Sequence, residues 1–306
     1  MGMNSRHEQV LSDTVSALSY SDTLPGLCHY RWQGEPLPSH KAAQEIVDLC
    51  RSLIFPGFFG DSAVNRFNVV YHAGLWMERL FALLIDQIIA GLSLQRSCQP
   101  ELMLEQLKEE ATATAEAFIR QLPELRRILG TDVRATYLGD PAATSTEEVV
   151  YCYPGIRAIS SYRIAHALIE LGVPVLPRMI SELAHGETGA DIHPGATIGE
   201  AFTIDHGTGI VIGATAIIGN NVKLYQGVTL GAKSFDMDDD GNPVKGVPRH
   251  PIIGNNVVIY SNSTILGRIT IGDGAVIGGN LWITDNVAPG EKLVQAKPDN
   301  ILRFQQ

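Results

Sequence analysis

The stretch Ile253–Ala288, IGNNVVIYSNSTILGRITIGDGAVIGGNLWITDNVA, divides into six consecutive blocks of six residues, and Ile opens every block. Seven more blocks of this kind, opened by Ile or Leu, run from Ile192 to Phe235, with Ile210 and Val211 as two extra residues. A period of six fits neither the α-helix nor the two-residue alternation of a strand. It is an internal repeat typical of a parallel β-helix built from hexapeptides.

Each hexapeptide has the composition that one short strand and one turn require. The leading Ile or Leu points inward, and a small residue four places later fills a tight inner position. Gly or Asn takes turn conformations that β-branched residues avoid. Three blocks close one triangular coil, so residues about 18 apart stack. We predict a left-handed parallel β-helix over residues 187–306, in which the repeat breaks from Pro289 and Gly290 onward and a tail follows.

The repeat is interrupted between residues 235 and 251 by FDMDDDGNPVKGVPRHP. A loop extruded from a coil costs little closure entropy and is a frequent place for function. Its DMDDDG segment, residues 236–241, imitates the start of a calcium-binding loop, but Val247 stands where that loop needs a bidentate Glu. A solvated acidic turn is the favoured interpretation, and cation binding by this segment stays open.

Before about residue 185 the apolar residues follow a helical period. Stripes of this kind cover Ile46–Ile54, Phe81–Leu92 and Leu104–Leu122, and the third is expected to break at or near Pro123. A further helix is expected over 156–171. The sequence therefore predicts an α-helical domain over residues 1–186, ahead of the β-helix, and an α+β class overall. The stripes indicate packing between helices or between subunits.

The composition favours a soluble globular protein. The chain has 306 residues, is 45% hydrophobic and carries a formal net charge of -10, which argues against nucleic-acid binding. The segment Leu80–Leu92 is too short to span a bilayer, and residues 1–10 lack the apolar core of a signal peptide. We expect a cytoplasmic location, without membrane or nucleic-acid partners.

A few charged and imidazole side chains stand out in the aliphatic repeat. They are Asp191, His193, Asp205, His206, Arg249 and His250. Asp191 precedes His206 by slightly less than one coil, so the two fit adjacent coils near one corner, where a carboxylate bound to one imidazole nitrogen leaves the other free as a base. The histidines at 185, 193, 206 and 250 instead suggest a zinc site, although they lack compact ligand spacing. Spacing alone leaves both interpretations open.

Motifs in the second half decide between them by resemblance. DIHPGATIGEAFTIDHGTGIVIGATAIIGNNV, then LYQGVTLGA and RHPIIGNNVVIYSNSTILGRITIG, resemble the serine O-acetyltransferases, which use acetyl-CoA to acetylate serine at the start of cysteine synthesis. The likeness covers about residues 132–298. GDPAAT at 139–144 and YRIAHAL at 162–168 belong to it as well.

The resemblance implies a role for each matching residue. His206 would be the general base and Asp191 would orient it. Asp140 and Asp205 would hold the substrate ammonium, Arg249 would hold its carboxylate, and His250 would line the site. Coenzyme A would lie against Gly231, Ala232, Ser261 and Lys297. Acetyl-CoA would be a co-substrate, with no metal and no permanently bound cofactor.

The resemblance also implies partners. The family builds its site between the subunits of a trimer, and two trimers can pair into a hexamer. L-serine would be the substrate and L-cysteine a feedback inhibitor. In many relatives a C-terminal Ile enters the next enzyme, O-acetylserine sulfhydrylase; this chain ends in Gln306, so we do not expect that complex. The alternatives are O-acetylation of another small hydroxylated acceptor, and a zinc hydratase-like or scaffolding trimer.

Overall fold

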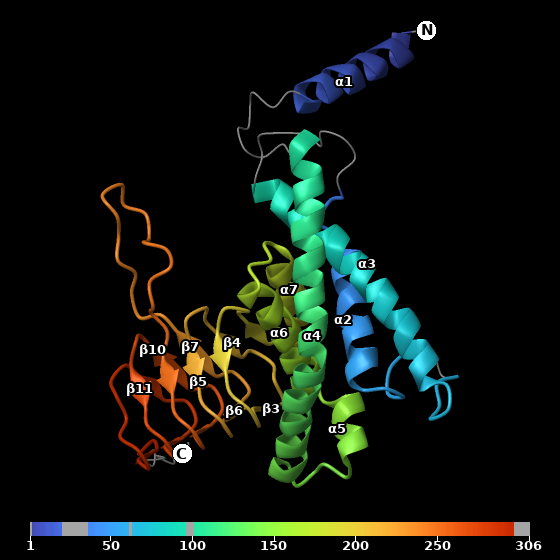
Figure 1. Cartoon of the computed structure of the whole chain (residues 1–306). Helices are drawn as coiled ribbons and strands as arrows, with labels where there is room; N and C mark the ends of the chain where they lie inside the picture. Colours follow the sequence, from blue (N-terminus) through green and yellow to red (C-terminus); the bar gives the residue numbers. More distant parts are fainter. Residues whose placement is uncertain (1, 20–35, 61–62, 96–100, 297–306) are drawn as a thin grey trace, which may run out of the picture.

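The computed structural model describes residues 2–19, 36–60, 63–95 and 101–296 of the chain. Within these ranges seven α-helices precede fourteen short β-strands (Figure 1). The helices are α1 (Gly2–Ser19), α2 (His40–Ile54), α3 (Val69–Gln95), α4 (Glu101–Gly139), α5 (Thr146–Cys152), α6 (Pro154–Glu170) and α7 (Leu176–Thr188). The order of helices first and repeat second confirms the sequence prediction. None of the described helices is long and apolar enough to cross a membrane.

The strands are two or three residues long, as a six-residue repeat requires. They are β1 (Asp191–Ile192), β2 (Thr197–Ile198), β3 (Thr203–Asp205), β4 (Val211–Ile212), β5 (Ile217–Ile218), β6 (Lys223–Tyr225), β7 (Thr229–Gly231), β8 (Ile252–Ile253), β9 (Val258–Ile259), β10 (Thr264–Leu266), β11 (Thr270–Ile271), β12 (Val276–Ile277), β13 (Trp282–Ile283) and β14 (Lys292–Leu293).

The strands stack into three parallel sheets that form the sides of a prism. Sheet 1 has the order β1-β4-β7-β10-β13, sheet 2 the order β11-β8-β5-β2, and sheet 3 the order β14-β12-β9-β6-β3. The chain visits sheets 1, 2 and 3 in turn, so a residue after a sheet 3 strand lies at the corner between sheets 3 and 1. We call this corner 3/1, and the corner between sheets 1 and 2 is corner 1/2.

The coils of the prism are not all of equal length. A regular coil consists of three hexapeptides, as in the pairing of Ile253 with Ile271. The first coil is longer, because Ile204 pairs with Leu224. The two additional residues lie between β3 and β4, at corner 3/1. These two residues therefore form a wider turn, and the strands before and after this turn keep their regular pairing.

The leading residues of the blocks fill the prism. Ile212, Leu224, Ile259 and Ile277 are each at most 1% exposed. Removing such aliphatic side chains from water supplies the main driving force for folding, about 25 cal/mol per Å² of apolar surface. Turn asparagines, such as Asn256 with φ of 56°, adopt the left-handed conformation that the repeat needs.

The last strand corrects the sequence analysis. The repeat is expected to break from Pro289 and Gly290, yet β14 follows and pairs with β12 in sheet 3. Its register joins Val276 to Lys292, so this coil is shorter than a regular one. A shortened turn through Pro289-Gly290 therefore still returns the backbone to the sheet, because φ of 71° at Gly290 permits it.

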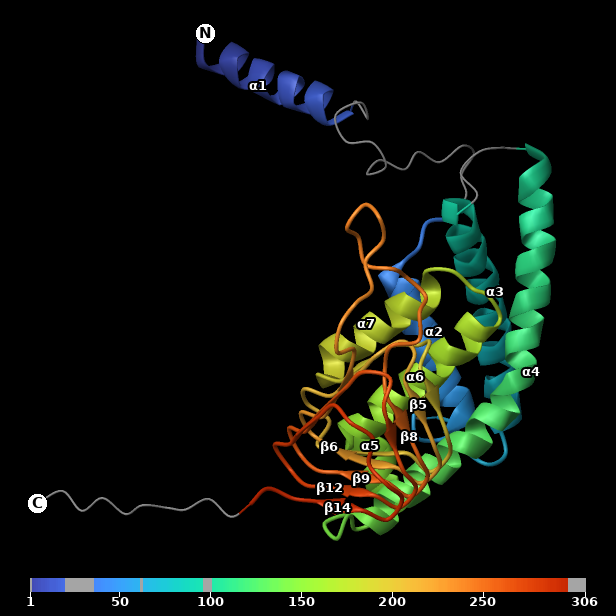
Figure 2. The same ribbon diagram turned by 90° about the vertical axis from the view of Figure 1, so that its left-hand side faces the viewer.

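Helix α4 corrects a second expectation. It runs without interruption from Glu101 to Gly139 and contains Pro123 in its interior. Proline removes one backbone donor from a helix. Buried side chains on both sides of it, among them Phe118 and Leu129, continue the same packed stripe. This packing keeps the segment helical, and α4 is the long helix beside the β-helix in Figures 1 and 2.

The extruded loop leaves the prism after β7 and returns at β8 (Figure 1). An antiparallel bridge between Met237 and Pro243 closes it. At its tip Asp238 Oδ1 accepts hydrogen bonds from the backbone N–H groups of Asp240 and Asn242, at 3.1 and 2.8 Å. The DMDDDG segment is thus an exposed turn held by its own aspartate.

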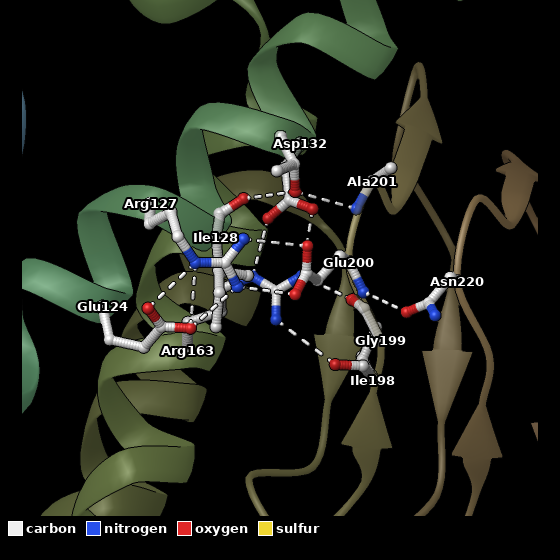
Figure 3. A network of polar contacts seen from close by, with 11 residues as sticks. Glu124, Arg127, Ile128, Asp132, Arg163, Ile198, Gly199, Glu200, Ala201 and Asn220 are labelled. Atoms are coloured by element: carbon white, nitrogen blue, oxygen red, sulfur yellow. Dashed lines mark hydrogen bonds and ion pairs between the residues drawn. The ribbon is translucent and has the colours of Figure 1, made fainter.

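A buried ion pair fastens the helices to the first coil (Figure 3). Arg163 on α6 binds both carboxylate oxygens of Asp132 on α4, at 2.6 and 3.0 Å. The same guanidinium donates to the carbonyls of Ile198 and Gly199, while Asp132 accepts from the N–H of Phe202. Asp132 is 0% exposed. This network fixes the C-terminal part of α4 against the β-helix.

Candidate active site

His206 lies at corner 3/1, directly after β3. Ile204 points into the prism, so Asp205 faces outward and His206 falls on the turn. The φ of His206 is 59°, a left-handed conformation that is costly for a residue other than glycine and is often found at functional sites. Its side chain is 73% exposed, and its Nε2 atom lies 3.5 Å from Asp205 Oδ1.

Lys223 binds the other oxygen of Asp205 from the next coil. Its Nζ atom lies 3.0 Å from Asp205 Oδ2 and also donates to the carbonyl of Gly139, at 2.9 Å. Burial lowers the pKa of Lys223, but the bonds to Asp205 and the influence of Tyr225 outweigh it, and the pKa lies above its usual value. Lys223 therefore stays charged and joins β3 to the end of α4.

Asp140 approaches the same corner from the helical side. It follows Gly139, the last residue of α4. Its Oδ2 accepts a hydrogen bond from the Tyr153 hydroxyl at 2.6 Å, and its Oδ1 accepts one from the Ala142 N–H at 2.8 Å. These bonds, and then the charges of Lys223 and His206, lower the pKa of Asp140. The corner thus holds two carboxylates beside one imidazole, an arrangement suited to a substrate that carries an ammonium group.

His250 belongs to a second group, at corner 1/2. Its ring packs directly on Gly213, where an added Cβ would lie 2.0 Å from the ring. Its Nδ1 faces the N–H and hydroxyl of Thr215, at 3.1 and 2.8 Å. Burial, then the charges of Arg249, His193 and Arg268, lower the pKa of His250 to about 4. His250 is therefore neutral at physiological pH.

Arg249 stands beside His250 at the base of the extruded loop. Its backbone N–H donates to the Thr215 hydroxyl at 2.9 Å, and its Nε atom is buried without a hydrogen-bond partner among the described residues. It lines a cleft of about 190 Å³ together with Lys233, Phe235 and Arg268. A planar guanidinium beside the positive charges of Lys233 and Arg268 suits a carboxylate or phosphate.

Comparison with known proteins identifies the family of the chain. Residues 250–285 match the family model described as bacterial transferase hexapeptide (six repeats). A plasmid-borne serine acetyltransferase of Synechococcus elongatus is 47% identical over 291 residues, covering 94% of this chain and 91% of its own. The chain belongs to the serine acetyltransferase family.

Solved structures of this family show the same architecture. Serine acetyltransferase isoform 3 of Entamoeba histolytica, in complex with cysteine, superposes with a TM-score of 0.71 at 32% identity, covering 95% of this chain and 92% of its own. Soybean serine acetyltransferase complexed with serine superposes with a TM-score of 0.52 at 28% identity, covering 83% of this chain and 96% of its own.

Against this family background, the structure separates the predicted residues into two groups. Asp140, Asp205 and His206 converge at corner 3/1, whereas Arg249 and His250 lie at corner 1/2 of the same chain. No hydrogen bond or ion pair among the described residues joins one group to the other. The substrate-binding set expected from the family resemblance is therefore not assembled within one copy.

Asp191 lies near the same corner as His206, as their spacing predicts, but no recorded contact joins these two described residues. It lies at the start of β1, near corner 3/1, where its N–H donates to the carbonyl of Ile210 at 2.8 Å. The structure records no hydrogen bond or ion pair between Asp191 and His206, both of them described residues; the carboxylate beside His206 is Asp205. Burial and the charge of Arg178 lower the pKa of His193, and the negative charge of Asp191 partly opposes this lowering.

The residues expected to bind coenzyme A also lie at both corners. Gly231 ends β7 and Ala232 follows it at corner 1/2, while Ser261 follows β9 at corner 3/1. The Leu266 side chain lies 2.9 Å from where a Gly231 Cβ would stand, so little room for a side chain exists there. Lys297 and Gln306 lie outside the described residues.

The four histidines considered for zinc do not gather. His193 and His250 both lie at corner 1/2, where the charge of His193 helps to lower the pKa of His250, but His206 lies at corner 3/1 and His185 lies on α7. The part of the chain that the structure describes holds no group of three or more His, Cys, Asp or Glu side chains placed to hold a metal ion.

Sequence reasoning missed Lys223 and Tyr153. Lys223 occupies an outward strand position, and in the sequence it resembles any solvent-exposed lysine. The structure places it near Asp205 because β6 pairs with β3 across the enlarged first coil. Tyr153 precedes Pro154 at the start of α6, and nothing in its local pattern links it to Asp140. Thr215 and Arg268 were missed for the same reason. The Thr215 hydroxyl accepts a hydrogen bond from the Arg249 N–H, and Arg268 donates to the carbonyl of His250, and both bonds join residues far apart in the sequence.

Proposed function

We propose that this protein transfers the acetyl group of acetyl-CoA to the hydroxyl of L-serine, with His206 as general base. The observation that carries the proposal is the exposed imidazole of His206, held in a left-handed turn between the carboxylates of Asp140 and Asp205. An exposed imidazole can reach and accept the proton of a bound hydroxyl, and the carboxylates offer a place for the substrate ammonium. Relatives named serine acetyltransferase support the same activity.

The reaction needs one proton transfer in each direction. His206 takes the proton of the serine hydroxyl as the oxygen attacks the thioester carbonyl. The carbon–sulfur bond then breaks, and the imidazolium returns the proton to the departing thiolate, which gives O-acetyl-L-serine and CoA. General-base assistance of this kind contributes roughly 100- to 10,000-fold. Holding both substrates in line supplies a further large factor.

The serine ammonium binds at corner 3/1, between Asp140 and Asp205. Lys223 already neutralises Asp205 Oδ2, so Asp205 Oδ1 and Asp140 remain for the ligand. The resemblance assigns Asp191 to orient His206. That role stays a proposal, since in the structure Asp205 is the nearer carboxylate.

The serine carboxylate binds Arg249 of a neighbouring copy. Arg249 and His206 of one chain lie at different corners of the prism, too distant in the fold to bind one small amino acid. A ring of copies that packs corner 3/1 of one chain against corner 1/2 of the next would unite them. Such heterologous interfaces close into cyclic oligomers, and the family resemblance makes a trimer the expected ring.

Acetyl-CoA binds along the same interface between copies. Ser261 shares corner 3/1 with His206, while Gly231 and Ala232 share corner 1/2 with Arg249. The residues assigned to coenzyme A therefore divide between the corners in the same way as those assigned to serine. This agreement supports one composite site, with the extruded loop, which carries Lys233, at its edge.

L-cysteine is proposed as an inhibitor at the serine subsite. It differs from serine only in sulfur for oxygen, so the same ammonium and carboxylate contacts serve both. Support comes from the relatives: an Entamoeba histolytica enzyme was solved with cysteine and the soybean enzyme with serine.

The test is the release of free thiol from acetyl-CoA by the purified protein. L-serine should give turnover, while homoserine, threonine and sugar acceptors should give little. A higher kcat/KM with another acceptor would favour the alternative function, O-acetylation of that compound. His206→Asn should lower turnover at least about 100-fold. His185→Asn, at an exposed position of α7, is the matched control and should stay near wild type.

A further inference from the structure

A second cleft lies between α2, the segment that follows it and α3. It has a volume of about 670 Å³, within the range of small-molecule sites, and no residue assigned to the acetyl-transfer reaction lines it. In Figure 1 the helices α2 and α3 lie across α4 from the β-helix, and the cleft is therefore remote from both corners. Its lining includes Leu49, Arg51, Phe59 and Trp76.

Arg51 lines this cleft as a buried cation, and no described residue provides its counter-ion. The residue is 8% exposed, and its Nε atom has no hydrogen-bond partner in the described part of the chain. Its recorded contact is the Phe59 ring, whose centroid lies 4.0 Å from the guanidinium carbon. Buried guanidinium groups are nearly always paired with an anion, because removing an unpaired charge from water is costly.

The acidic residues that line the cleft are already engaged. Glu45 is bound by Arg79 through two hydrogen bonds, of 2.7 and 3.0 Å. Asp48 accepts from the Gln44 amide at 3.1 Å and lies 3.4 Å from Arg157. Arg157 itself binds Glu187 more closely, at 2.7 Å. Neither Glu45 nor Asp48 has a recorded contact with the Arg51 guanidinium, and Lys41 adds a second positive charge to the lining.

The remaining walls are apolar. Trp76 packs against Gly60 so closely that a Cβ there would lie 2.7 Å from the indole. The indole is thus fixed in place as one wall, with Leu49 and Phe59 nearby. A pocket with one cationic anchor and rigid aromatic walls selects a ligand with an anionic head and an apolar body.

We propose that this cleft binds a small organic anion, with its carboxylate or phosphate on Arg51 and its apolar body against Trp76 and Leu49. The ligand supplies, through charge-assisted hydrogen bonds, the counter-ion that no described residue provides for this buried guanidinium. The site stands independently of the acetyl-transfer site.

The test uses the full chain labelled with 5-fluorotryptophan. Of its three tryptophans, Trp76 is assigned from the fluorine spectrum of Trp76→Phe. Benzoate and phenyl phosphate are titrated as anionic probes, benzamide as the neutral probe of the same shape, and inorganic phosphate as the anion without an apolar body. We expect both aromatic anions to shift the Trp76 resonance saturably, and benzamide and inorganic phosphate to shift it far less.

Two arginine variants sharpen the result. Arg51→Gln should weaken benzoate and phenyl phosphate binding by about tenfold or more, because it removes a charge-assisted bond. Arg66→Gln is the matched control: Arg66 also lies over a phenyl ring, that of Phe67 at 4.5 Å, but on the exposed surface. It should bind as wild type does.

Several outcomes would overturn the proposal. An equal shift from benzamide, no shift from either anion, or unchanged binding in Arg51→Gln would each do so. A Trp76 resonance that responds to protein concentration and not to the anions would show that a second copy covers the cleft. The wild-type comparison of benzoate with benzamide needs no variant to fold. Saturating L-serine and the Arg249→Ala variant separate this site from the serine site, and neither should alter the Trp76 shift.

Discussion

The separation of His206 and Arg249 onto different corners predicts complementation between subunits. His206→Asn removes the base, and Arg249→Ala removes the carboxylate partner, so each variant alone should be nearly inactive. Mixed assemblies should recover activity, because one copy supplies an intact corner 3/1 and its neighbour supplies an intact corner 1/2.

The size of the recovery follows from the geometry. In a closed ring each site takes His206 from one copy and Arg249 from the next. When equal amounts of the two variants assemble at random, each contribution is intact half of the time. About a quarter of the sites are then wild type, so the mixture should reach about a quarter of wild-type kcat. The serine KM of the mixture should equal that of the wild type, because the intact sites account for nearly all of the turnover.

The assay is thiol release from acetyl-CoA and L-serine after co-expression of the two variants. Co-expression of His206→Asn with a chain that carries both substitutions is the control, because no copy then has the base. Activity no higher than that of the separate variants would refute the composite site, and would require His206 and Arg249 to act within one copy or outside the reaction.

Three other predictions follow from contacts described above. Asp132→Asn, which leaves its guanidinium partner buried and unpaired, should lower the free energy of unfolding in urea by roughly 3–5 kcal/mol. Glu200→Gln, at an exposed ion pair, should lower it far less, and equal losses would contradict the burial argument. The pKa of His250 is about 4 in the folded protein and 6.5 in the unfolded chain, so the unfolded chain binds the proton first as the pH falls. The free energy of unfolding of the wild type should therefore be full above pH 6.5 and decrease by roughly 2–3 kcal/mol as the pH drops towards 4. His250→Gln should lack this decrease. Asp191→Asn should lower kcat with little change in the serine KM, whereas Asp205→Asn should raise that KM; a wild-type kcat in Asp191→Asn would transfer the orienting role to Asp205.

The sequence predicted the β-helix well because its repeat is both local and redundant. Thirteen blocks state the same pattern, so one irregular block, such as that around Ile210-Val211, does not hide it. The errors came where a single residue was given too much weight. Pro123 and Pro289 were interpreted as breaks, but packing around α4 and pairing with β12 outweighed the missing donors.

The candidate site was harder to predict than the fold. Asp205 and His206 were singled out because a charged pair is unusual in an aliphatic repeat, and the structure places them side by side. Lys223 escaped because its partner lies one coil away and its own sequence position looks ordinary. The resemblance implied a site shared between subunits but not which residues each copy supplies, since positions around the prism depend on which sheet each strand joins, and six-residue blocks look alike in sequence.

The unequal coil lengths have a consequence for how such a protein can change. Two residues are added between β3 and β4, and a far longer loop enters between β7 and β8, yet Ile217 still pairs with Ile252 and Ile204 with Leu224. Insertions at a corner stay local, because each strand finds its register from the strand beneath it rather than from the chain that precedes it. Each coil therefore keeps its register independently of the length of its turns. A turn at a reactive corner can be lengthened or exchanged while the strand pairing of the neighbouring coils stays the same.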